Sequence, residues 1–118
     1  MTIAKKTISG IEFEFVNSFR GNRSGFVHET TLFRNGRMAG AYRIQYYNRT
    51  WESYEYQSVM KGCVRELLED CRTAWETAWK NAHGIKRLTE AKRKTMTEEF
   101  ENDMPKNYAE LKELYAEL

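Results

Sequence analysis

Apolar and polar residues alternate in the first half of the chain. Residues 11–15, Ile-Glu-Phe-Glu-Phe, repeat with period two, which predicts a strand with one buried face. Residues 17–25 then lack periodicity and are rich in turn-forming residues, so we expect an exposed loop that carries Arg20 and Arg23.

A β-hairpin is predicted next, because segments 26–34 and 37–48 flank Asn35-Gly36, a dipeptide suited to a type I′ turn. A two-residue loop fixes the register, with Arg34 opposite Arg37 and Glu29 opposite Tyr42. This register predicts an apolar inner face made of Val27, Phe33, Met38, Tyr42, Ile44 and Tyr46. It predicts a mixed outer face made of His28, Thr30, Leu32, Arg43, Gln45 and Tyr47.

The second half of the chain is helical in pattern. Apolar residues recur at three- and four-residue spacing and predict a long amphipathic helix over about 54–83, which Gly84 ends. Tyr54 and Tyr56 fit either the start of this helix or a further strand. Shorter helices are expected over about 86–103 and 107–118, separated by Pro105. A flank of Leu68, Trp75 and Trp79 on the long helix would pack on a later helix or form a dimer seam.

These elements predict one α+β domain over residues 1–118. A three-stranded antiparallel sheet over about 8–50, or a four-stranded one if Tyr54 and Tyr56 form a strand, leads into the long helix and one or two C-terminal helices. A chain of 118 residues has the size of a single domain. It contains no apolar run of membrane-spanning length and no secretory signal pattern, so a cytoplasmic location is expected.

Composition and motifs do not indicate catalysis. Nineteen basic and seventeen acidic residues leave a formal charge of +2, which does not require a nucleic-acid partner. Cys63 and Cys71 would lie about 12 Å apart on a helix, too far for a disulfide, and are expected to be buried. His28 and His83 have no neighbouring partner in sequence, and Glu29 fits a sheet rim better than a general base. With no metal, nucleotide or acyl-transfer motif, we expect no cofactor, no metal and no enzymatic activity.

Tyrosine, tryptophan and arginine are concentrated between residues 42 and 56, and these residue types are enriched at recognition hot spots. The predicted contacts with a protein partner are Arg20, Arg23, Arg34, Arg37, Tyr47, Arg49 and Trp51. Alternatively, the outer sheet face would read nucleic acid, since sheets can enter a DNA groove. The residues for that role are His28, Thr30, Arg43 and Gln45.

Residues 46–60, with the sequence YYNRTWESYEYQSVM, resemble a segment found in small, mostly uncharacterised proteins of bacteriophages and mobile elements. The resemblance implies a short phage-type protein that acts in the cytoplasm of a bacterial host by binding and disabling or redirecting a host factor. Inhibitors of CRISPR effectors belong to this class. The leading hypothesis is therefore a non-enzymatic, anti-CRISPR-like inhibitor of a host protein or nucleoprotein complex, present as a monomer or homodimer.

Overall fold

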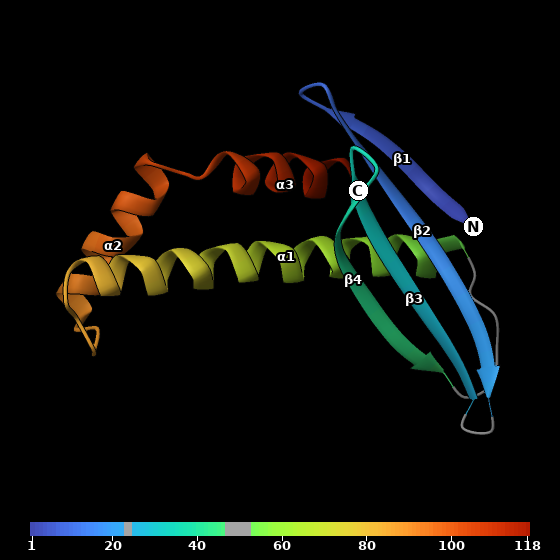
Figure 1. The fold of residues 1–118 in the computed structure, drawn as a ribbon, viewed down its shortest axis with the longest axis horizontal. Coiled ribbons are helices and arrows are strands. Elements are labelled where there is room, and N and C mark those ends of the chain that lie inside the picture. The colour runs from blue at the N-terminus through green and yellow to red at the C-terminus, as the bar shows by residue number, and fades with distance from the viewer. Residues whose placement is uncertain (23–24, 47–52) are drawn as a thin grey trace.

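The computed structural model describes residues 1–22, 25–46 and 53–118. Its α+β architecture combines a four-stranded antiparallel sheet with three helices, which confirms the predicted fold class (Figure 1). The strands are β1 (Thr2–Ile8), β2 (Ile11–Asn22), β3 (Gly25–Arg34) and β4 (Arg37–Tyr46), and they pair in sequence order. The helices are α1 (Ser53–Ala82), α2 (Glu90–Asn102) and α3 (Lys106–Glu117).

The sheet differs from the prediction at its N-terminal side. Its fourth strand is β1 (Thr2–Ile8), whereas Tyr54 and Tyr56 lie in α1. The expected loop over residues 17–25 is also wrong, because β2 continues as strand to Asn22. Turn-forming residues in this stretch are overridden by pairing with β3, which extends from Phe13 opposite Arg34 to Asn22 opposite Gly25.

The hairpin turn at Asn35-Gly36 is confirmed, and both residues have positive φ, 49° and 80°. Arg34 pairs with Arg37 and Phe33 with Met38, as predicted, but Leu32 then pairs with Gly40. Ala39 is therefore an extra residue on β4, a β-bulge, and every pair beyond it is shifted by one position.

The bulge reverses the predicted faces of β3. His28, Thr30 and Leu32 were expected on the outer face, yet their exposed fractions are only 1%, 0% and 0%. Met38, expected in the core, is 70% exposed. Glu29 lies opposite Arg43 instead of Tyr42. On β4, Tyr42 packs against the core as predicted, because the shift moves β3 relative to β4.

The main core lies between the inner face of the sheet and helices α1 and α3. α1 packs on β3 and β4, and α3 packs on β1 and on α1. The fully buried centre contains residues from β2, β3, α1 and α3, namely Phe13, Phe15, Leu32, Val64 and Leu114. The C-terminal helix is thus docked as part of the core.

Helix α1 is much longer than the sheet is wide. Its 30 residues correspond to about 45 Å, and its C-terminal half extends away from the sheet beside α2 (Figure 1). There the rings of Trp75 and Phe100 of α2 pack edge to face, with 5.1 Å between their centroids. The Trp79 indole N–H donates to the Glu99 carboxylate. The predicted packing of the Trp75 and Trp79 flank on a later helix is confirmed.

Candidate functional site

No described helix covers the outer face of the sheet, since all three helices lie on the inner side (Figure 1). Register places Val16, Val27, Thr31 and Phe33 on this face, together with Met38 and Ala41 of β4. Val27 is 9% exposed, whereas Met38 is 70% exposed. The face therefore combines an apolar centre with accessible apolar positions near the hairpin.

Charges on the outer face are largely neutralised in pairs. The Lys5 ammonium lies 3.2 Å from a carboxylate oxygen of Glu14 on the neighbouring strand. The Arg43 Nε donates to Glu29 Oε2 at 3.0 Å, and a second guanidinium nitrogen donates to the same oxygen. Because both pairs are internal to the sheet, the outer face offers a nearly balanced charge to a partner.

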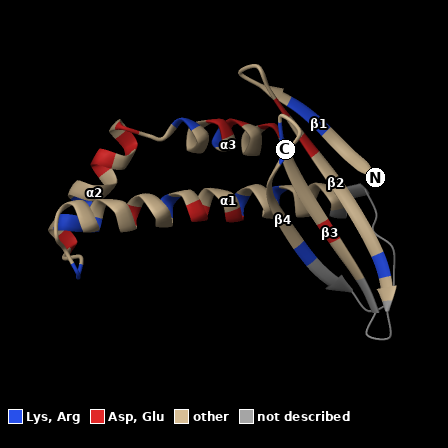
Figure 2. Ribbon diagram, viewed as in Figure 1, with Lys and Arg blue, Asp and Glu red and all other residues tan. Residues whose placement is uncertain are grey.

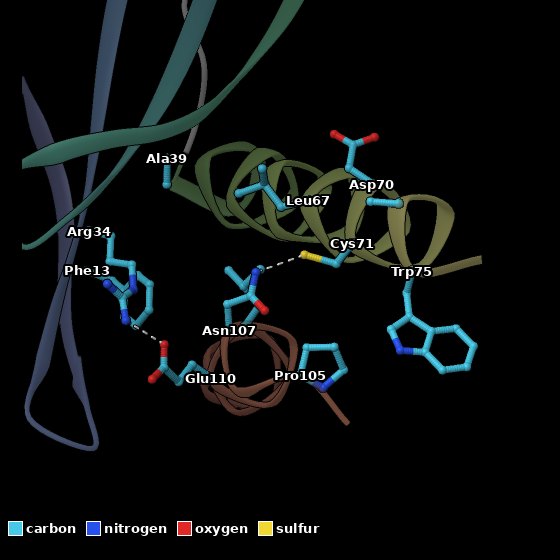
Figure 3. Close-up of a pocket in the computed structure, with 12 residues that line it drawn as sticks. Phe13, Arg34, Ala39, Leu67, Asp70, Cys71, Trp75, Pro105, Asn107 and Glu110 are labelled. Carbon is cyan, nitrogen blue, oxygen red and sulfur yellow. Dashed lines mark hydrogen bonds and ion pairs between the residues drawn. The ribbon is translucent and has the colours of Figure 1, made fainter. Parts of the chain in front are cut away.

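Of the predicted partner-binding residues, the structure describes Arg20, Arg34 and Arg37, and these three do not form one surface. Arg20 lies exposed on β2, and Arg37 is exposed at the hairpin. Arg34, although opposite Arg37 in register, turns inward and donates to Glu110 of α3 at 2.9 Å (Figure 3). Arg23, Tyr47, Arg49 and Trp51 lie outside the residues that the structure describes.

The residues of the nucleic-acid alternative are divided between the two faces. His28 and Thr30 are buried on the inner face beside Asn17. The Nδ1 atom of His28 lies 3.5 Å from the Asn17 amide nitrogen, and the Thr30 hydroxyl donates to the Asn17 amide oxygen at 3.4 Å. Arg43 is on the outer face in its pair with Glu29. Gln45 lies opposite Val27 in register. His28 and Thr30 therefore belong to a buried polar cluster and are not available for base contacts.

A cavity of about 560 Å³ lies between α1, α3 and the hairpin end of the sheet (Figure 3). Phe13, Leu67, Trp75 and Leu111 supply apolar lining. This volume is within the range of small-molecule pockets. Sequence reasoning missed the cavity, because it is formed by segments far apart in the chain.

Glu110 is the charged group buried in the cavity wall, at 4% exposed. Its Oε2 accepts from Arg34, and its Oε1 has no hydrogen-bond partner among the described residues. Oε1 is itself inaccessible to solvent, so a molecule in the cavity would not reach it without a rearrangement. We therefore interpret the Arg34–Glu110 ion pair as a structural contact that connects β3 of the sheet to α3.

The two cysteines differ in environment. Burial, with a smaller contribution from Glu66, raises the pKa of the Cys63 thiol to about 11. Burial also raises the pKa of Cys71, whose Sγ accepts from the Asn107 amide at 3.5 Å across the cavity. Both are free thiols, Cys63 buried and Cys71 half-buried. A raised pKa lowers the fraction of thiolate, so neither cysteine has the lowered pKa that is typical of a catalytic cysteine.

The described residues also contain no group of three or more His, Cys, Asp or Glu placed to hold a metal ion. None of the helices in residues 53–118 is long and apolar enough to cross a membrane. Comparison of the chain with protein-family models, with curated proteins and with solved structures yields no match.

Proposed function

We propose that this protein is a non-enzymatic binding protein that contacts a protein partner through the outer face of its sheet. The observation that carries the proposal is the uncovered face itself. An accessible sheet face with apolar positions such as Phe33 and Met38, surrounded by paired charges, has the layout of a protein interface.

Charge balance favours a protein partner over nucleic acid on this face. The basic residues that register places there, Lys5, Arg20 and Arg43, are matched by Glu12, Glu14 and Glu29. Binding to a phosphate backbone depends on an excess of cations, and the described residues of this face do not supply one. Inhibition of a bacterial defence complex, the expectation from the resemblance over residues 46–60, is the biological setting in which we propose that this contact operates.

The proposal is tested by affinity capture from bacterial lysate with paired variants. Met38→Glu with Ala41→Glu adds two carboxylates to exposed positions of the outer face. Thr73→Glu with Thr77→Glu adds the same charge to exposed positions of α1. We expect a stoichiometric protein that the unmodified chain and the α1 variant retain and the sheet variant loses.

Two results would contradict this function. One is the absence of any stoichiometric protein partner for the unmodified chain. The other is equal retention of the partner by both variants, which would show that the outer face is not the contact. Circular dichroism establishes that both variants are folded before capture is compared.

A further inference from the structure

Basic residues are concentrated at the end of the molecule that lies farthest from the sheet. Residues 80–94 contain six basic side chains and a single acidic one, Glu90, whereas the remaining chain has thirteen basic and sixteen acidic residues. We call this cluster the basic tip; it consists of Lys80, Lys86, Arg87, Lys92, Arg93 and Lys94. Figure 2 shows basic segments around the end of α1 and the connection to α2.

The cations of the basic tip are accessible. Five of the six are exposed, and Lys80 is half-buried. None of them forms an ion pair with another described residue, unlike Lys5, Arg34 and Arg43 elsewhere. In the part of the chain that the structure describes, these cations are therefore not held in ion pairs.

The backbone that carries the tip is held by hydrogen bonds at both helix ends. At the end of α1, Gly84 has φ of 64° and the Ile85 N–H donates to Lys80 O at 2.9 Å. At the start of α2, the Thr89 hydroxyl accepts from the Lys92 N–H at 3.3 Å. The connection between these caps is short, so the cations are presented from a defined turn. The N-terminal end of α2 adds a partial positive charge.

The surroundings of the cations determine which acidic partner fits. Protein interfaces contain an apolar centre, but the large apolar side chains that are exposed in the described residues are Met1, Phe19 and Met38, none of them at the tip. Ile85 and Leu88, the apolar residues of the connection, are half-buried. A cationic surface without an exposed apolar anchor matches a phosphate backbone, whose binding is dominated by electrostatic attraction.

We propose that the basic tip binds the phosphate backbone of nucleic acid without sequence preference. This inference does not rest on the proposed function, because the tip and the outer sheet face use different residues at different ends of the molecule. A protein with both surfaces would hold a protein partner at the sheet and contact nucleic acid at the end of α1.

The test measures fluorescence anisotropy of a labelled 20-base-pair duplex of random sequence between 50 and 200 mM KCl. For four to six phosphate contacts, the slope of log K against log salt is expected to be about −3.5 to −5.5. A variant with Lys86→Gln, Lys92→Gln and Lys94→Gln should bind at least about tenfold more weakly, with a slope reduced in magnitude by about 2 to 3.

The matched control removes three lysines elsewhere, through Lys61→Gln, Lys106→Gln and Lys112→Gln. It has the same net charge as the tip variant and should retain most of the affinity and slope. Equal losses in the two variants would overturn the tip as the site, and so would absence of duplex binding at 50 mM KCl. Tighter binding of labelled polyglutamate than of duplex at equal ionic strength would overturn nucleic acid in favour of an acidic protein. Circular dichroism checks that both variants fold.

Discussion

Two arginines that face each other across the hairpin have different roles. Arg34 and Arg37 are paired in register at the exposed end of the sheet. The Arg34 guanidinium, however, contacts the buried carboxylate of Glu110 at 2.9 Å, whereas Arg37 is exposed. Sequence reasoning treated the two as equivalent, because Glu110 lies 76 residues away in the chain. Arg34 therefore contributes to the stability of the fold, whereas the exposed side chain of Arg37 is the one of this pair that a partner can reach.

Replacing Arg34 by Ala should lower the free energy of unfolding by about 1 to 3 kcal/mol, since it leaves the Glu110 carboxylate buried and unpaired. Arg37→Ala is the matched control, and its effect should stay within about 0.5 kcal/mol. Urea denaturation measures both. Equal effects of the two substitutions would show that the Arg34–Glu110 contact adds nothing to stability.

Cys63 gives a pH-dependent prediction. Its pKa of about 11 in the folded protein exceeds the ordinary thiol value of 9.0, so its contribution to stability is fully present below pH 9 and is lost as the pH rises through 11. In the native protein, iodoacetamide at pH 8 should modify half-buried Cys71 before buried Cys63. Peptide mass mapping after short labelling times measures this order. Modification of Cys63 at the rate seen in urea would contradict its burial.

At the scale of elements, the strand-to-helix order follows from periodicity, but the register beyond Phe33 does not. The period-two pattern of β2 and the three- and four-residue spacing of α1 each record one buried face, so both elements were predicted. The bulge at Ala39 lies in Ala39-Gly40-Ala41, where small side chains leave no pattern by which to detect an extra residue. The residue next to the bulge has a tertiary neighbour that the local sequence does not reveal, because Gly40 packs closely against Leu67 of α1.

Gly40→Ala tests that contact. A Cβ at Gly40 would lie 2.6 Å from Leu67 Cδ2, so the leucine or the strand must shift, at a cost of about 1 to 3 kcal/mol in the free energy of unfolding. In the background of Leu67→Ala the same substitution should cost markedly less, because the clashing atoms are gone. Urea denaturation of the unmodified protein, the two single variants and the double variant gives the coupling energy between the two positions. A coupling energy near zero would contradict the close approach of Gly40 to Leu67.

At the scale of the whole molecule, side chains pack around two centres. The first lies under the sheet, around Phe13, Phe15 and Leu114. The second lies along the C-terminal half of α1. There the ring centroid of Phe100 in α2 lies 5.1 Å from that of Trp75 and 4.8 Å from that of Tyr108 in α3. The helical pattern predicted that the tryptophan flank would pack on a later helix or form a dimer seam, and the structure shows the first of these. That apolar pattern does not reveal the basic tip. The net charge of +2 does not reveal it either, because a sum over the whole chain does not say where the charges lie.

Two packing centres imply that the region around α2 can open without unfolding the sheet. Only Met96 and Phe100 of α2 are buried, so few apolar contacts oppose its opening. Phe100→Ala should therefore accelerate amide hydrogen exchange in α2 by at least about tenfold, while amides of β2 and β3 keep their protection. Exchange followed by mass spectrometry at peptide resolution measures this.

Leu114→Ala is the comparison, since it removes a fully buried side chain from the first centre and should accelerate exchange in the sheet as well. If Phe100→Ala instead accelerates exchange in β2 and β3 as much as in α2, the two centres unfold together, and the basic tip is held by the same cooperative unit as the sheet.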